Sequence, residues 1–215
     1  MLCGGPSDLA MDLCGDCHAE LPALGCACKR CGLPVEDHTL CGPCATDPPY
    51  FEHTIAAMYY SSPVDSFITQ LKYHRRMHYT RILAGLMRPV IQAQVREWPQ
   101  CLMPVPLHPR RLRQRGFNQA LELARLLAKP LRLAVDYRSL QRTRDTPPQT
   151  QFPADERQRN IKKAFTLRRP VPYQHVALVD DVMTTGATAN EIAQLLLQNG
   201  VKRVDVWLCA RAVLA

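Results

Sequence analysis

The sequence contains no apolar run as long as the roughly 18 uncharged residues that a membrane helix needs, and only 7% of its 215 residues are aromatic. Its first residues, MLCGGP, provide neither the basic nor the apolar region of a secretory signal peptide. We therefore predict a cytoplasmic protein without membrane insertion. Acidic residues are scarce in most of the chain: residues 51–215 hold 25 basic and 12 acidic side chains, whereas residues 1–50 hold 2 basic and 7 acidic ones. This asymmetry predicts two units with different roles.

Cysteine is concentrated at one end of the chain. Eight of the ten cysteines lie within the first 44 residues, and six of them form three Cys-x-x-Cys pairs separated by loops of 10 and 9 residues. Two residues between thiolates let both sulfurs reach one zinc ion at about 2.3 Å. We predict zinc rather than disulfides, which rarely persist in a reducing compartment, and rather than an iron–sulfur cluster, whose ferredoxin spacing is missing. The pairs are Cys14 with Cys17, Cys28 with Cys31, and Cys41 with Cys44.

The spacing defines one zinc site more completely than the other. The last two pairs form a full four-cysteine set because only a short loop separates them. The first pair lacks a partner pair, and either Cys3 or Cys26 would supply its further ligand. Cys3 is typical of the second half of a pair whose first cysteine would precede Met1. With so few large apolar residues, a head of residues 1–50 is expected to fold only around metal, separately from a body of residues 51–215.

From residue 51 onward, apolar runs typical of strands alternate with amphipathic patterns typical of helices. This alternation predicts an α/β body with a mainly parallel sheet flanked by helices. Pro89 is expected to kink or split one helix and Pro130 to stop another. The unpatterned segment 141–163 is typical of a mobile functional loop. Strands are expected at 55–60, 101–107, 131–137, 175–179 and 203–209, and helices at 63–73, 82–91, 118–129 and 189–199.

One segment combines acidic and phosphate-binding features. The apolar strand 176–179 is followed by Asp180 and Asp181 and then by a hydroxyl-rich turn that opens a helix. Adjacent carboxylates can accept hydrogen bonds from two vicinal hydroxyls, such as those of ribose. The turn offers successive backbone N–H groups at a helix start, which predicts a phosphate nest. The glycine patterns of a P-loop and of a dinucleotide-binding motif are both absent. The residues of the turn are Thr184, Thr185, Gly186, Ala187 and Thr188.

The segment VALVDDVMTTGAT, residues 176–188, resembles the signature of type I phosphoribosyltransferases. Further segments are similar to one branch of that group, the ComF family with its GntX-like proteins. With the cysteine-rich head, the resemblance covers nearly the whole chain. These segments are the helix 67–73 with its Leu-Lys-Tyr end, the block from Pro104 to Gln119, and a loop region with Arg142, Gln149, Arg157, Asn160 and Phe165.

The resemblance implies a type I phosphoribosyltransferase-like fold that binds phosphoribosyl pyrophosphate (PRPP) or a nucleotide with Mg²⁺. Asp180 and Asp181 would hold the ribose, the turn 184–188 would hold the 5-phosphate, and Arg115 would join the two acids as a catalytic residue. Phosphoribosyl transfer needs no protein nucleophile, so the protein's task is to neutralise and orient the leaving pyrophosphate. The residues expected near the pyrophosphate are Lys72, Val105, Pro106, Leu107, Arg110, Arg111, Arg142 and Arg157.

Three functions are compatible with these features. The chain could be a Mg²⁺-dependent phosphoribosyltransferase, a non-catalytic sensor of PRPP or a nucleotide, or a factor that handles single-stranded DNA together with DNA-uptake proteins. The resemblance favours a link to DNA, because ComF proteins are associated with the uptake and use of DNA by bacteria. The positive charge does not distinguish DNA binding from the other two functions, since a polyphosphate ligand also requires a basic site. The sequence contains no basic ribbon interleaved with aromatic residues, of the kind that binds single strands.

Overall fold

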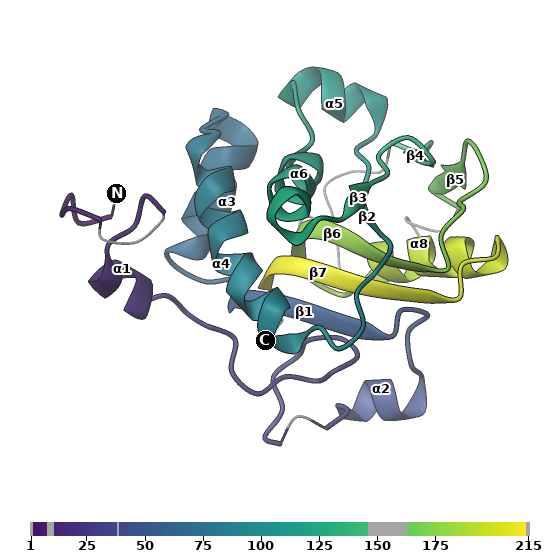
Figure 1. Cartoon of the computed structure of the whole chain (residues 1–215), viewed down its shortest axis with the longest axis horizontal. Coiled ribbons are helices and arrows are strands. Elements are labelled where there is room, and N and C mark those ends of the chain that lie inside the picture. Colours follow the sequence, from purple (N-terminus) through teal and green to yellow (C-terminus); the bar gives the residue numbers. More distant parts are fainter. Residues whose placement is uncertain (1, 8–10, 38, 146–162, 214–215) are drawn as a thin grey trace.

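The computed structural model describes residues 2–7, 11–37, 39–145 and 163–213. At its centre is a five-stranded sheet with the order β1-β7-β6-β2-β3, in which every neighbouring pair is parallel (Figure 1). This confirms the α/β architecture predicted from the alternating patterns. The strands are β1 (His53–Tyr59), β2 (Cys101–Pro104), β3 (Ala134–Val135), β6 (His175–Met183) and β7 (Arg203–Arg211).

Helices cover both faces of the sheet and bury two apolar layers. Along β6, Ala177 and Val179 belong to one apolar layer, which lies beneath three helices. Val176 and Leu178 belong to the other layer, which lies beneath a single helix. Successive strand residues point to opposite faces, so the same alternation continues into the two acids that follow. The helices are α3 (Val64–His74), α4 (His78–Gln94) and α6 (Gln119–Leu131) on one face and α8 (Ala187–Gln198) on the other.

The cysteine-rich head lies against one side of the body. Its helix α1 (Gly15–Ala19) lies beyond α3 at one end of the molecule, and α2 (Gly42–Thr46) lies below β1 (Figure 1). Leu13, Cys17 and Leu21 are buried in the same apolar layer as α3 and α4. The segment after α1 forms an antiparallel bridge between Ala23 and Met58 of the edge strand β1. The division into a head and a body at residue 50 stays a prediction.

Several expected boundaries were wrong. Pro89 neither splits nor ends α4, which continues to Gln94; the proline lies on the exposed side of the helix, and Met87 and Ile91 lie on the buried side. Pro130 lies inside α6, which ends one residue later at Leu131. The second and third expected strands are shorter than their apolar runs. Sequence patterns also missed the short helix α5 (Pro109–Arg115) and the antiparallel pairing of β4 (Leu140–Arg142) with β5 (Phe165–Leu167). No helix in the described ranges is long and apolar enough to cross a membrane.

Candidate functional site

A cleft of about 200 Å³ opens where β1, β2 and β6 end. In parallel sheets, ligands bind at this edge because the loops that follow the strands converge there. Segments far apart in the sequence meet in the cleft, among them most of the residues predicted from the sequence. Those predicted residues are Lys72, Val105, Pro106, Leu107, Arg111, Arg115, Arg142, Asp180, Asp181, Thr184, Gly186, Ala187 and Thr188.

The turn 184–188 connects the end of β6 to the first turn of α8. Gly186 adopts a φ of +81°, in the left-handed region that favours glycine, and serves as the N-cap of α8. The carbonyl of Gly186 accepts from the N–H of Asn190 at 2.9 Å, which fixes the first turn of the helix. Thr185 does not line the cleft; its Oγ1 accepts from the N–H of Ala187 at 3.3 Å. The turn therefore presents the N-terminal end of α8 to the cleft, where an anion is favoured.

The two acids lie inside β6 rather than after it, and they have different surroundings. Asp181 is 3% exposed and forms an ion pair with the ammonium group of Lys72 from α3. Its Oδ1 also accepts from Nε2 of Gln119 on α6, at 3.3 Å. Asp180 points to the other face of the sheet, where α8 begins, and its Oδ1 accepts from the N–H of Asp181 at 2.9 Å. The structure thus distinguishes the two acids: Asp181 is paired with a cation, whereas Asp180 faces the cleft without an ion pair among the described residues.

The electrostatics of the two acids diverge accordingly. Burial and the adjacent Asp181 carboxylate raise the pKa of Asp180 well above its usual value. Burial by itself would also raise the pKa of Asp181, but the Lys72 ammonium and three hydrogen bonds outweigh it and lower the pKa of Asp181. The same ion pair outweighs desolvation at the ammonium and raises the pKa of Lys72. A pair of carboxylates whose pKa values are pushed apart is typical of functional sites.

Asn118 holds the loop after β2 in place. Its side-chain Oδ1 accepts from the N–H of Ala120 at 3.0 Å and caps α6, while its Nδ2 donates to the carbonyl of Val105 at 3.0 Å. The N–H of Val105 also donates to the carbonyl of Val179 on β6, at 3.0 Å. One asparagine therefore joins the start of α6 to the segment 105–107, and both border the cleft.

Arg115 is held by two neighbouring side chains. Its Nη1 donates to Oε1 of Gln119 at 2.6 Å, and its guanidinium lies 5.8 Å from the ring centre of Tyr73. Because Gln119 also bonds Asp181, Arg115 is linked to the acids through a single side chain. The linked side chains of Arg115, Gln119, Asp181 and Lys72 place two cations and one carboxylate, together with a neutral amide, in one wall of the cleft.

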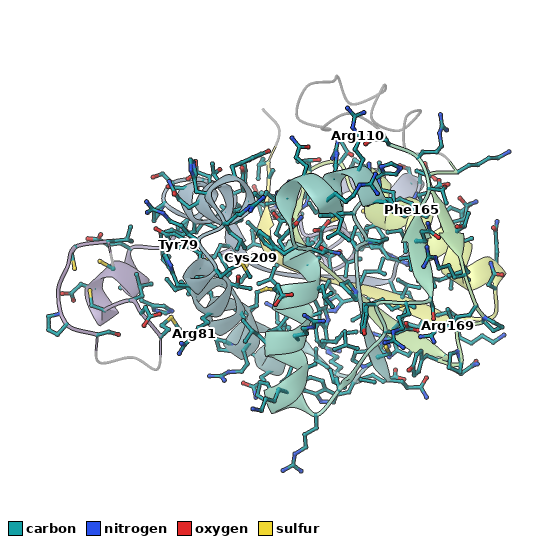
Figure 2. The ribbon with its side chains drawn as sticks, turned by 90° about the horizontal axis from the view of Figure 1, so that it is seen from above. Tyr79, Arg81, Arg110, Phe165, Arg169 and Cys209 are labelled. Carbon is teal, nitrogen blue, oxygen red and sulfur yellow. The ribbon has the colours of Figure 1, made fainter. Side chains whose placement is uncertain are left out.

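The other predicted basic residues differ in how they approach the cleft. Arg142 is 7% exposed, lines the cleft and lies 5.7 Å from the ring centre of Phe165. Arg111 lines it too, with Nε 3.9 Å from Oδ1 of Asp145. Arg110 does not line the cleft: its guanidinium projects outward from α5 (Figure 2), 3.4 Å from Asp145. Arg157, together with the other loop residues Gln149 and Asn160, lies outside the described residues.

The head contains two groups of cysteines that can each hold a metal ion. In each group the sulfurs lie within 4.8 Å of one another, close to the edge of about 3.8 Å that a tetrahedral zinc–thiolate site has. The first group shows Cys3, rather than Cys26, beside the first cysteine pair. We call these the N-proximal cluster, Cys3, Cys14 and Cys17, and the sheet-proximal cluster, Cys28, Cys31, Cys41 and Cys44.

Sequence reasoning assigned no role to three residues that the structure brings to this region. Tyr60 follows β1 and lines the cleft together with Gln119. Gln119 belongs to the block that carries the family resemblance, which was the available signal. Arg211, the last residue of β7, is buried and contacts the start of the turn. Its role was hidden because its partners are distant in the sequence.

These features define a class: an α/β protein with a parallel sheet, a cleft at the carboxyl ends of its strands, and an N-terminal region whose described residues include two cysteine clusters able to bind metal. No family model matches the chain. The chain does resemble known proteins. It is 38% identical over 218 residues to DNA utilization protein YhgH of Salmonella typhimurium, and the match covers 99% of this chain and 96% of that protein. It is 32% identical to competence protein F of Haemophilus influenzae, covering 98% and 95%.

A more distant relative is competence protein ComFC of Bacillus subtilis, 23% identical over 87% of this chain and 79% of that protein. The matches to the Salmonella typhimurium and Haemophilus influenzae proteins, both above 30% identity, extend over almost the full length of both partners, so the likeness includes the cysteine-rich head as well as the sheet. This chain belongs to the ComF family.

Proposed function

We propose that the cleft binds PRPP or a nucleotide together with Mg²⁺. The observation that carries this proposal is the placement of Asp180 and the turn 184–188 side by side on one face of β6, in a cleft with basic walls. The turn suits a 5-phosphate, and the Asp180 carboxylate suits the hydroxyls of a ribose. The distance between them is set by only three intervening residues, so both would act on one small ligand.

The basic residues around the cleft suit the pyrophosphate end of that ligand. Lys72, Arg111, Arg115 and Arg142 all line the cleft and come from three separate elements, α3, α5 and β4. Guanidinium groups bind phosphate oxygens in a bidentate manner, and an ammonium group adds a compact charge. The segment 105–107 would approach the same phosphates through its backbone. Arg110 would contribute only through the overall positive field, because it points away.

The donor set also fits Mg²⁺, which prefers oxygen ligands and is commonly bound by one or two carboxylates plus substrate phosphates. Of the two adjacent acids, Asp180 is the one without a salt bridge among the described residues, so it and the ligand's own oxygens would hold the ion. When bound, the ion would offset the negative charge that develops on a departing pyrophosphate. Asp181, already paired with Lys72, would hold neighbouring side chains in position rather than bind the ion.

Titration calorimetry with PRPP and Mg²⁺ tests the proposal. The intact protein is expected to release or absorb heat with a stoichiometry of about one. Asp180→Asn is expected to weaken binding by about 10- to 150-fold, because a hydrogen bond to a charged group contributes about 1.5–3 kcal/mol. Turnover would also release pyrophosphate, so an assay for free pyrophosphate in the same samples separates an enzyme from a sensor.

The matched control for this titration is Glu122→Gln. Glu122 lies on the outer side of α6, where it pairs with Arg125 at 2.9 Å, and does not line the cleft. This variant also removes one negative charge, so it is expected to bind PRPP as the unaltered protein does. Absence of heat from the unaltered protein would sink the small-molecule proposal.

A second function is favoured by the names of the relatives and by the surface beside the cleft. We propose that this surface contacts single-stranded DNA in the cytoplasm during the use of DNA. Nη2 of Arg75 donates to the carbonyl of Gln114 at 3.0 Å, which joins the end of α3 to α5. Exposed side chains gather there that can contact phosphates and stack on a base. They are Tyr73, Arg75, Arg76, Arg110 and Arg113.

We expect the affinity for an oligo(dT) strand to fall steeply with added salt. Changing Arg75, Arg76, Arg110 and Arg113 to Gln should reduce the slope of log K against log salt by about 0.7 for each phosphate that the variant no longer neutralises. The control changes Lys129 and Arg132, which are exposed at the far end of α6, to Gln. Fluorescence anisotropy at several salt concentrations measures the slopes. Equal slopes for both variants would reject this surface as the DNA contact.

A further inference from the structure

A single buried arginine joins the sheet-proximal cluster to the turn of the cleft. Arg211, at the end of the interior strand β7, is 3% exposed. Its Nε donates to the carbonyl of Cys31 at 2.8 Å. Its Nη1 donates to the carbonyl of Met183 at 3.0 Å and to that of Thr184, where the turn begins. One guanidinium therefore fixes the backbone of a cysteine in the cluster relative to the backbone of the proposed phosphate site.

The segment 28–32, which contains two cysteines of the cluster, also packs closely on the sheet. The Oγ1 of Thr54 on β1 donates to the carbonyl of Arg30 at 2.6 Å. Gly32 has a φ of +70°, and a Cβ there would lie 3.1 Å from the Thr54 side chain and 3.7 Å from that of Arg211. The close approach that lets Arg211 reach Cys31 thus depends on a glycine.

A second connection runs through Phe51. Nη1 of Arg30 donates to the carbonyl of Phe51 at 2.9 Å. The Phe51 ring is buried beside the turn, since a Cβ on Gly186 would lie 3.7 Å from it. The segment 28–32 therefore contacts the turn through the buried side chain of Phe51 as well as through Arg211.

The charges are also complementary. Four thiolates around one Zn²⁺ leave an excess of negative charge, and the guanidinium remains protonated at any physiological pH. A buried cation is stable only with such partners and with its donors satisfied. Neutral carbonyls accept from Nε and Nη1 of Arg211, and the metal-loaded cluster would supply the compensating charge nearby.

We infer that Arg211 is a positioning residue that couples metal occupancy of the sheet-proximal cluster to the conformation of the turn 184–188. A metal ion in the cluster fixes the position of Cys31, and the carbonyl of Cys31 fixes the guanidinium of Arg211. The guanidinium in turn fixes the carbonyls of Met183 and Thr184, where the turn begins. Coupling between two sites is reciprocal, so an occupied turn should in return retain the metal. The coupling deepens the proposed function and rests on it only for the identity of the ligand.

Hydrogen exchange of the zinc-loaded protein, followed by mass spectrometry on the peptide that spans residues 183–188, tests the coupling without any ligand. Arg211→Lys retains the charge but loses the planar set of donors, so one ammonium cannot span the same carbonyls. It is expected to speed exchange of the turn by about 10-fold or more while the cysteines keep their zinc. Exchange unchanged in Arg211→Lys would overturn the inference.

Two further variants keep this experiment interpretable. Arg203→Lys makes the same change at the start of β7, where the guanidinium bonds Asp205 and Glu97 instead, and is expected to leave the turn unchanged. If Arg211→Lys proves insoluble, Thr54→Val removes the bond to Arg30 with little change in volume. It should speed exchange of the turn in the same direction but less strongly. Unchanged exchange in Thr54→Val would then count against the coupling.

Release of zinc to a coloured chelator, with and without PRPP that is saturated with Mg²⁺, tests reciprocity. PRPP is expected to slow release from the sheet-proximal cluster by about 5-fold or more in the unaltered protein and not in Arg211→Lys. Protection that persists in Arg211→Lys would overturn the coupling. If calorimetry shows no PRPP binding, the proposed function fails, and the exchange measurement still decides the role of Arg211.

Discussion

Replacement of Cys28 or Cys44 by Ser is expected to remove one zinc ion per chain and to unfold the head. Both side chains are buried, with exposures of 1% and 5%, and both belong to the sheet-proximal cluster. Apparent zinc-binding free energies in small zinc-organised domains are about 10–16 kcal/mol, which is comparable to the entire stability of a typical protein. Elemental analysis of zinc and thermal unfolding measure the two effects.

The matched control for these substitutions is Cys26→Ser. Cys26 is an exposed cysteine of the same head and belongs to neither metal-binding group of the described residues. It is expected to leave the zinc content and the unfolding temperature unchanged. A Cys28→Ser protein that keeps both its zinc and its unfolding temperature would contradict a structural metal site, and loss of zinc from Cys26→Ser would place the ligands elsewhere.

The central sheet was predictable because each of its main strands carries a local signal. The residues around Val176–Val179 and Val204–Cys209 form apolar runs too short for buried helices, and the helices between the strands have their own periodicity. The metal clusters were predictable for a similar reason, since paired cysteines are close in sequence. Local patterns therefore gave the fold class and the neighbourhood of the site.

Features that depend on distant partners could not be predicted in this way. The helix α5 is short, polar and without buried residues, so it has no apolar periodicity to detect. The different surroundings of Asp180 and Asp181 depend on which face of β6 each side chain points to and on what packs there. Lys72 meets Asp181 across more than a hundred residues of sequence, and Arg211 meets Cys31 across a still longer span.

Lys72→Met is expected to destabilise the protein by about 2–3 kcal/mol at pH 7. The substitution keeps an apolar stem but removes the cation of Asp181, a carboxylate that is 3% exposed. Breaking a fully buried pair costs about 3–5 kcal/mol, and the effect should be smaller here because Lys72 is 21% exposed and solvent screens part of the interaction. Urea unfolding without ligand measures the difference in free energy.

The pH dependence identifies the cause of this destabilisation. In the unaltered protein the pKa of Asp181 is lowered by folding, so Asp181 contributes stability above its unfolded pKa and loses it as the pH falls through the folded value. Without Lys72, burial should raise the pKa of Asp181 instead. The deficit of Lys72→Met is therefore largest at neutral pH and shrinks as the pH is lowered and Asp181 takes up a proton.

A double-mutant cycle completes the test. Lys72→Met combined with Asp181→Asn removes both charges, so it should recover most of the stability lost in Lys72→Met alone. Lys129→Met, at the exposed end of α6, is the control for the loss of a lysine and should change the free energy of unfolding by less than about 0.5 kcal/mol. A deficit of Lys72→Met that is equally small, or that does not vary with pH, would show that the ion pair contributes little. A large, pH-dependent deficit would mean that Lys72 keeps Asp181 charged, which leaves Asp180 as the acid with a raised pKa that faces the ligand.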